Sequence, residues 1–167
     1  MKKMKIYNFI IDRKNSALHI HPRVKYDSVE LVYGPSTLKN NNVFDVTKGK
    51  KIFDAISFTY SVDWVFSEKV KNLFEENNVT GIEFYPIVIE GVEEKYFGYF
   101  ITGRAGKVLN TDEMDCIPMF EPLKYNENEW DGSDVFLFSN STGGFITEKV
   151  KNIFDKNKIT NLRIRER

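Results

Sequence analysis

The chain has 167 residues, a formal net charge of zero, and a composition that is 41% hydrophobic and 14% aromatic. This length fits one globular domain, and the composition excludes a disordered chain. Zero net charge excludes a global attraction to nucleic acid or to an anionic membrane. We therefore expect a single domain over residues 1–167, with no nucleic-acid or membrane partner.

Cysteine content and the opening residues indicate a compartment. The chain has one cysteine, Cys116, so no intrachain disulfide can form, which is typical of a reducing compartment. The apolar run from Ile6 to Ile11 is cut off by Asp12 and is too short for a signal peptide. No stretch approaches the ~20 apolar residues of a membrane span. The sequence predicts a soluble cytoplasmic protein, in which Cys116 is a small buried side chain rather than a nucleophile.

The N-terminal third predicts strands and a break. Strands are expected at 5–12, 17–20 and 28–33, and "YGPSTLKNNN" is typical of a turn-rich break. His19 and His21 would share one strand face, where two imidazoles can hold a metal. A third ligand cannot be placed from the sequence. We expect a polar strand face and no metal.

Two stretches of the chain are nearly the same. "FSEKVKNLFEENNVTGIEF" (66–84) and "ITEKVKNIFDKNKITNLRI" (146–164) align without a gap at a spacing of 80 residues, with 8 identities in 19 positions. The register extends upstream, because Asp54 and Phe58 align with Asp134 and Phe138. Two copies are too few for a solenoid. We expect a duplicated module with pseudo-repeats at 54–84 and 134–164.

Each copy predicts a helix. Ser67 and Thr147 are suited to the N-cap position, and an Asn-containing pair after each helix suits its C-terminal end. One helical face carries apolar residues at helical spacing in both copies. These residues are Val70, Leu73 and Phe74 in the first copy, and Val150, Ile153 and Phe154 in the second. We expect Val70, Phe74, Val150 and Phe154 in one shared core.

Strands should flank each helix. The pattern alternates at 82–84 and 162–164, and apolar runs precede the helices at 52–58 and 135–138. Residues 96–101 and 105–109 are expected to form a hairpin around Gly103, so "GRAGK" is a turn rather than a phosphate loop. The predicted fold class is α+β, with mainly antiparallel sheets, two pseudo-repeat helices and a duplicated strand–helix–strand module.

A loop-rich acidic insert is expected at 110–133, just before the second copy. From Thr111 to Asp134 there are eight acidic residues and one lysine, a net charge of −7, whereas the first fifty residues carry ten basic and four acidic residues, a net of +6. A solvated loop explains the acids, and so does a docking surface for a basic partner. Met119, Phe120, Tyr125 and Trp130 lie among the acids, and interface centres favour such side chains. The predicted partner-binding residues are Asp112, Glu113, Asp115, Tyr125, Glu127, Glu129, Trp130 and Asp131.

The same motifs resemble a known group. Residues 66–87, the "WDGSDVF" of 130–136, and 145–162 are similar to bacterial immunity proteins of polymorphic toxin systems, including immunity protein families 43 and 11. The resemblance touches roughly the C-terminal two-thirds of the chain. It implies a small cytosolic protein that binds and blocks a cognate toxin domain, with no enzyme activity and no cofactor. The matching motifs hold the fold, so no functional residues follow from it.

Other functions remain open. A non-catalytic interaction or scaffold domain with a different partner explains the same features. An enzyme would need paired groups, and nothing in the sequence fixes a separation between any two carboxylates. "DGSD" (131–134) lacks the pattern of a calcium loop and is typical of a tight turn. We expect no catalytic residues and no metal site.

Overall fold

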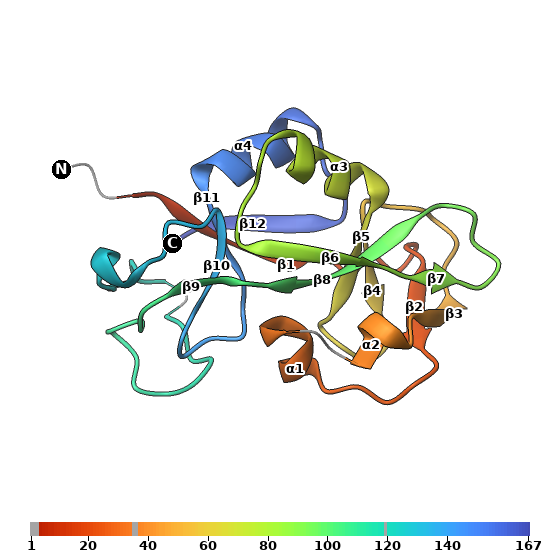
Figure 1. The fold of residues 1–167 in the computed structure, drawn as a ribbon, viewed down its shortest axis with the longest axis horizontal. Coiled ribbons are helices and arrows are strands. Elements are labelled where there is room, and N and C mark those ends of the chain that lie inside the picture. Colours follow the sequence, from red (N-terminus) through yellow and green to blue (C-terminus); the bar gives the residue numbers. More distant parts are fainter. Residues whose placement is uncertain (1–3, 35–36, 119) are drawn as a thin grey trace.

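Figure 1 shows a computed structural model of the chain, which describes residues 4–34, 37–118 and 120–167. Its elements, in chain order, are β1 (Ile6–Ile11), β2 (His19–Pro22), α1 (Ser28–Tyr33), α2 (Thr37–Asn40), β3 (Val43–Lys48), β4 (Ala55–Phe58), β5 (Trp64–Ser67), α3 (Glu68–Glu76), β6 (Ile82–Pro86), β7 (Val88–Ile89), β8 (Tyr96–Ile101), β9 (Gly103–Ala105), η1 (Glu127–Glu129), β10 (Val135–Phe138), β11 (Phe145–Thr147), α4 (Glu148–Lys156) and β12 (Leu162–Glu166). The fold class is α+β. Within the described residues, no helix has both the length and the apolar character needed to cross a membrane.

The described strands form two mixed sheets. One has the order β12-β1-β11-β10-β9, and the other has the order β6-β8-β5-β4-β2-β3-β7. The pairs β2–β4, β3–β7 and β9–β10 are parallel. The other pairings between the described strands are antiparallel, so the sheets are mainly antiparallel as expected, and the parallel pairs were not predicted. Long connections, such as that from β2 to β4 through α1, α2 and β3, allow a parallel return.

β1 and β8 occupy corresponding places in the two sheets. β1 lies between β12 and β11, and β8 lies between β6 and β5. Ile11 pairs with Leu162 in one sheet, and Ile101 pairs with Ile82 in the other. β1 thus lies among strands of the C-terminal half, whereas β8 lies among strands that precede it in the N-terminal half.

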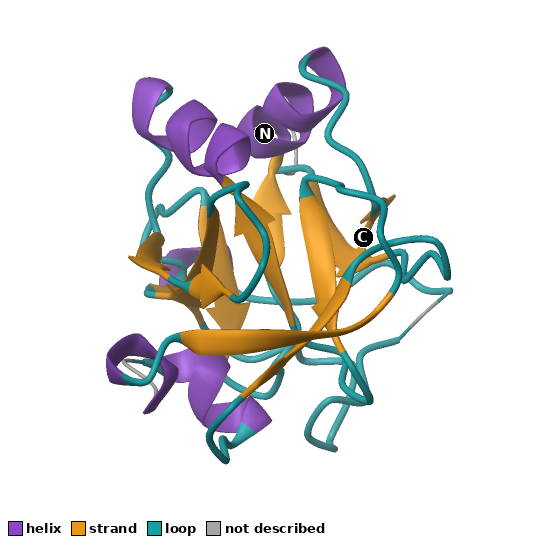
Figure 2. Cartoon of the chain, turned by 90° about the vertical axis from the view of Figure 1, so that its right-hand side faces the viewer, coloured by secondary structure: helices purple, strands orange, loops and turns teal. Residues whose placement is uncertain are grey.

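α3 and α4 lie together on one side of the sheets, opposite α1 and α2 (Figures 1 and 2). Val70, Phe74, Val150 and Phe154 are buried in one cluster. The rings of Phe74 and Phe154 stack with their centroids 5.4 Å apart. The prediction that these four side chains share a core is confirmed.

The residues before the helices bond differently from the prediction. Ser67 and Thr147 occupy the N-cap positions, but neither side chain makes a capping hydrogen bond. Ser67 Oγ instead donates to Asp54 Oδ1 at 3.1 Å, and Thr147 Oγ1 donates to Asp134 Oδ1 at 3.4 Å. The aspartate immediately before β4 or β10 therefore accepts the hydrogen bond of the hydroxyl that would otherwise cap the helix.

The helices end through a left-handed residue one position later than the C-cap. Asn77 and Asn157 have φ of −98° and −97°, whereas Asn78 and Lys158 have φ of 49° and 50°. Each cap asparagine donates its side-chain amide to the carbonyl four residues earlier, at 2.8 Å. The predicted ends are thus in the right place, and the cap asparagines act through their amides.

Reciprocal hydrogen bonds join the end of each helix segment to the start of the other segment's first strand. Asp54 Oδ2 accepts from Thr160 N and from Thr160 Oγ1, both at 2.9 Å. Asp134 Oδ2 accepts from Thr80 N at 3.1 Å. In addition, Lys69 Nζ donates to the Asn157 carbonyl at 2.9 Å, and Lys149 Nζ donates to the Asn78 carbonyl at 3.1 Å. Aspartate, lysine and threonine that are identical in the two stretches make these contacts.

We expect Asp54→Ala and Asp134→Ala each to lower the free energy of unfolding by about 1–3 kcal/mol, because each removes the acceptor of the opposite threonine amide. The control is Asp155→Ala, which removes only a surface i,i+4 pair with Lys151 and should cost under about 0.5 kcal/mol. Urea unfolding of the three variants measures this difference. Equal losses in all three would show that the reciprocal contacts add no stability.

The predicted strand at 28–33 is wrong. The segment forms α1, because Asp27 Oδ1 accepts from Val29 N at 2.7 Å and from Glu30 N at 3.3 Å and so caps a helix. The strand β3 was not predicted. β5, which was not predicted either, runs directly into α3.

The predicted hairpin around Gly103 is also wrong. Only Thr102 separates β8 from β9, which pairs in parallel with β10 in the other sheet, with Gly103 opposite Phe136. A Cβ atom on Gly103 would lie 2.0 Å from the Val135 carbonyl oxygen, so this crossing of the strands requires glycine. "GRAGK" therefore carries the chain from one sheet to the other.

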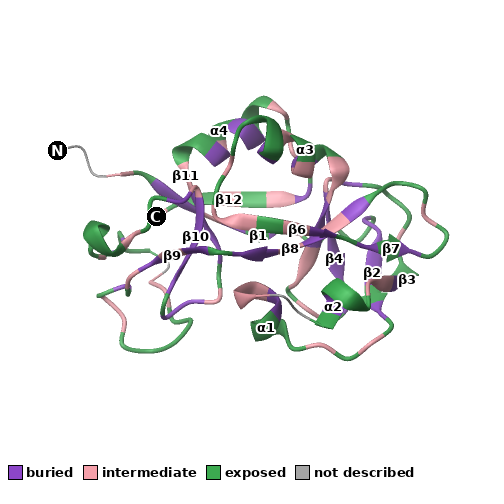
Figure 3. Cartoon of the chain, viewed as in Figure 1, coloured by how far each residue is buried: buried purple, intermediate pink, exposed green. Residues whose placement is uncertain are grey.

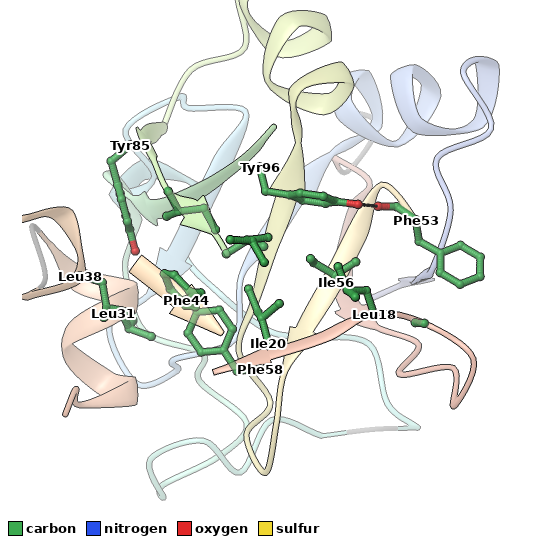
Figure 4. Close-up of a cluster of buried hydrophobic side chains, with 14 of the residues drawn as sticks. Leu18, Ile20, Leu31, Leu38, Phe44, Phe53, Ile56, Phe58, Tyr85 and Tyr96 are labelled. Carbon is green, nitrogen blue, oxygen red and sulfur yellow. Dashed lines mark hydrogen bonds between the residues drawn. The ribbon is translucent and has the colours of Figure 1, made fainter. Parts of the chain in front are cut away.

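A second core lies between the seven-stranded sheet and the short helices. Figure 4 shows side chains of this cluster, including Leu31 and Leu38 from α1 and α2 beside Phe44 and Phe58. Tyr96 lies within the cluster, and its hydroxyl donates to the Phe53 carbonyl at 2.7 Å. Figure 3 shows that buried residues concentrate in the strands of both sheets, which leaves the loops at the ends of the molecule exposed.

Candidate docking surface

The acidic insert is an irregular segment held to the five-stranded sheet at its base. Leu123 is 1% exposed, and Val108 bridges to Tyr125. Leu109 N donates to the Lys124 carbonyl at 2.7 Å, so the two arms of the insert run side by side. The other described residues of the insert are loop, apart from the 3₁₀ turn η1. The prediction of a loop-rich segment is confirmed.

The two predicted aromatic anchors are directed inward. Tyr125 and Trp130 are half-buried and pack against the cluster beneath the insert. Their rings lie 5.3 Å from Phe138 and 5.8 Å from Phe136, respectively, and Trp130 Nε1 donates to the Ser133 carbonyl at 3.1 Å. These two rings attach the insert to the core, which leaves little of either for a partner.

Asp115 is exposed and yet holds the neighbouring hairpin. Its carboxylate accepts from both the backbone amide and the hydroxyl of Thr142, and Asp115 N donates to the Asn140 carbonyl at 3.0 Å. Asp115 itself has a left-handed φ of 59°. Its first role is therefore to fasten the insert to the turn between β10 and β11.

Asp131 closes the insert by several hydrogen bonds. Asp131 Oδ1 accepts from Ser133 N at 2.9 Å, and Oδ2 accepts from Arg104 N at 2.7 Å. Partial burial raises the pKa of the Asp131 carboxyl, but the hydrogen bonds from Ser133 and Arg104 outweigh this and leave the pKa below its usual value of 3.8. Gly132 has φ of 84°, and the bond from Ser133 N to the Asp131 carboxylate makes the start of "DGSD" an Asx turn.

The lowered pKa of Asp131 makes a pH-dependent contribution to stability. A folded-state pKa below the unfolded one stabilises above about pH 4, and this contribution is lost as the pH falls through the folded pKa. We expect Asp131→Asn to be less stable than wild type at neutral pH, with a difference that shrinks toward about pH 3. Urea midpoints across this range measure it, with Asp112→Asn as the control. A difference that stays constant with pH would contradict the assignment.

The other predicted carboxylates face solvent. Asp112, Glu113, Glu127 and Glu129 are exposed, as is Glu121. Glu129 accepts a hydrogen bond from Asn126 within the insert, and Glu113 accepts one from Cys116. In the described part of the chain, no carboxylate from Asp112 to Asp131 forms a salt bridge.

Three exposed apolar side chains lie within this acidic surface, and none of them was among the predicted site residues. Phe120 is 93% exposed, Leu109 is 61% exposed and Met114 is 50% exposed. Met119, which the sequence placed with this group, lies outside the described residues. Phe120 follows no periodic pattern, so the sequence could show its presence among the acids but not its orientation. We call Leu109, Met114, Phe120 and the exposed carboxylates the insert surface.

The two histidines and Cys116 were considered as possible metal ligands and as a possible nucleophile. His19 is buried, with Nδ1 2.8 Å from Ser57 Oγ and Nε2 3.3 Å from the Lys14 carbonyl oxygen, whereas His21 is exposed. Cys116 is exposed, which corrects the prediction that it is buried. The hydrogen bond to Glu113, together with the negative charges of Glu113 and Asp115, raises the pKa of its thiol, which disfavours the reactive thiolate.

Comparison of the chain with protein-family models, and with curated protein sequences, finds no match. The chemistry of the insert surface is therefore the basis for a functional conclusion.

Proposed function

We propose that the protein is a cytoplasmic, non-catalytic binding module: an immunity protein that binds a cognate bacterial toxin domain and neutralises it by direct contact. The observation that carries this proposal is the insert surface, where Phe120 is 93% exposed among carboxylates that form no salt bridge within the described residues. An exposed aromatic ring with charges around it is the arrangement of an interface hot spot and its rim.

The charge of the insert indicates the kind of toxin. Its net charge of −7 over residues 111–134 favours a basic partner, because complementary fields speed association and fix orientation. Toxins that act on nucleic acid are basic where they neutralise phosphates. An acidic inhibitor surface would occupy such a groove and exclude the phosphates.

The rest of the fold holds the insert surface in place. The Asp115 carboxylate accepts a hydrogen bond from Thr142, and the Asp131 carboxylate accepts from Ser133 and Arg104. Tyr125 packs inward against Phe138. A surface that is already ordered loses less conformational entropy on binding than a free loop. This supports tight binding by a segment that has little regular secondary structure.

The same proposal includes an origin for the fold by duplication, with pseudo-repeats at 54–84 and 134–164 in one domain. The equal element order, the matching registers of β1–β12 and β6–β8, and the reciprocal bonds of Asp54 and Asp134 support it. A contact in which each side presents the same residues is the mark of twofold symmetry. In this arrangement β1 completes the sheet of the second unit, and β8 completes the sheet of the first.

A scaffold domain with a non-toxin partner is the alternative, and toxin co-expression separates the two. Cells that express the toxin domain of the adjacent reading frame should grow only when this protein is present. A triple variant, Asp112→Lys, Glu121→Lys and Glu127→Lys, should lose protection while remaining folded. The matched control reverses the exposed carboxylates Glu76, Glu83 and Glu94, and it should protect as wild type does. Equal growth arrest with and without the wild-type protein would contradict the immunity function for that toxin.

A further inference from the structure

A compact basic surface lies on two neighbouring segments that the proposed function does not use. Arg13, Lys14, Lys48, Lys50 and Lys51 are all exposed, and we call them the basic patch. The segments are joined by backbone hydrogen bonds from Lys50 N and Lys51 N to the Ser16 carbonyl, at 3.4 and 3.0 Å, and from Leu18 N to the Lys51 carbonyl, at 2.9 Å. These bonds place the two segments that carry the five cations side by side.

The positive charges of the basic patch are poorly compensated. Among the described residues, the ion pair that involves the patch is a 4.0 Å contact between Lys14 and Asp12. Lys14 and Lys51 both lie over the ring of Phe53, at 5.2 and 5.1 Å from its centroid. Cations crowded in this way repel one another, so an anionic surface that covered them would be attracted strongly.

The basic patch and the insert surface lie at opposite ends of the molecule. β2 and β3, which adjoin the two basic segments, lie at the right of Figure 1, whereas the insert lies beside β9 and β10 at the left. The molecule is therefore electrically polarised along its length, although its net charge is zero.

We propose that the basic patch binds the insert surface of a second copy of this chain. A nucleic acid also carries negative charge, but zero net charge gives the whole molecule no attraction to it, whereas the acidic insert accompanies every basic patch in solution. Because the two surfaces differ and lie at opposite ends, the contact is head-to-tail and does not close into a twofold dimer.

This self-association has a consequence for the availability of the insert surface. Each contact covers one insert with the basic patch of a neighbour, so a basic partner must displace that neighbour. The contact depends on charges in water, and the range of the field shrinks from about 30 Å at 0.01 M salt to about 8 Å at physiological ionic strength. We therefore expect the association in concentrated protein at low salt.

Sedimentation velocity of the purified chain over a range of concentrations tests the proposal. At 0.01–0.02 M salt, roughly one tenth of physiological ionic strength, the weight-average mass should rise above the 19.5 kDa monomer with concentration and return to it in 0.5 M salt. Neutralising the patch by Lys48→Gln, Lys50→Gln and Lys51→Gln should leave a monomer. Neutralising the insert by Asp112→Asn, Glu121→Gln and Glu127→Gln should also leave a monomer.

Mixing the two neutralised variants distinguishes a head-to-tail contact from any other. One variant keeps an intact insert and the other keeps an intact patch, so the mixture should form a pair of chains and stop there. Circular dichroism melts check that both variants are folded. A wild-type chain that stays monomeric at low salt overturns the proposal, and so does a mixture that stays monomeric. Patch-dependent binding of a single-stranded oligonucleotide by a chain that stays monomeric would assign the patch to nucleic acid instead and would also overturn it.

Discussion

Replacing Phe154 by alanine is expected to lower the free energy of unfolding by about 3–5 kcal/mol. The ring is 2% exposed, stacks on Phe74 at 5.4 Å and lies 6.4 Å from Phe66, so its removal leaves a cavity between the two helices and both sheets. Phe74→Ala should have a similar effect, because Phe74 is 3% exposed in the same cluster. A loss of this size is a large part of the stability of a typical domain.

Urea unfolding monitored by circular dichroism measures both losses. Phe120→Ala is the matched control, since it removes the same ring from a position that is 93% exposed and should change stability by less than about 0.5 kcal/mol. The double variant should lose less than the sum of the single losses, because the two rings contact each other. Additive losses, or losses no larger than the control, would show that the two helices do not share one core.

Phe120→Ala should instead have its large effect on toxin binding. We expect it to weaken binding of the cognate toxin domain by about 2 kcal/mol, or roughly thirty-fold in Kd, because exposed aromatic anchors carry most of the energy of an interface. The change should lie in the dissociation rate. Surface plasmon resonance measures both rates, and Trp130→Ala is the contrasting variant: its half-buried ring packs on Phe136, so it should lower stability more than affinity. An unchanged dissociation rate in Phe120→Ala would remove this ring from the interface.

The position of α3 and α4 could be predicted because local pattern and tertiary packing agree there. Val70 and Phe74, like Val150 and Phe154, lie at helical spacing, and the repeat places both pairs in equivalent surroundings. α1 was missed because a run of branched and aromatic residues at 28–33 also suits a strand. The N-cap hydrogen bonds accepted by Asp27 stabilise the helix, and they are visible only in the structure.

The crossing of the chain between the two sheets could not be predicted. Gly103 is compatible with a hairpin turn, and the reason for glycine is the Val135 carbonyl, which lies more than thirty residues later in the chain. β1 likewise pairs with β11 and β12, which lie near the other end of the chain. Local periodicity carries no information about which sheet a strand joins.

The negative charge of the candidate site could be predicted from the sequence, but the orientation of its side chains could not. Composition alone places the acidic residues in one segment, and the structure leaves most of them exposed. Composition cannot distinguish Asp115 and Asp131, which hold the insert together, from Asp112, which faces solvent. The sequence also cannot show that Trp130 is directed inward whereas Phe120 is directed outward, because an irregular segment has no periodic pattern of apolar residues that would indicate orientation.

Hydrogen–deuterium exchange of the protein, free and bound to the cognate toxin domain, tests most directly whether the insert is the docking surface. The account predicts that binding slows exchange of backbone amides between residues 109 and 131, with little change in α3 and α4. The experiment is run at physiological salt and low protein concentration, so that contacts between copies do not contribute. Protection confined to the basic patch or to the strands, with the insert unchanged, would contradict the account.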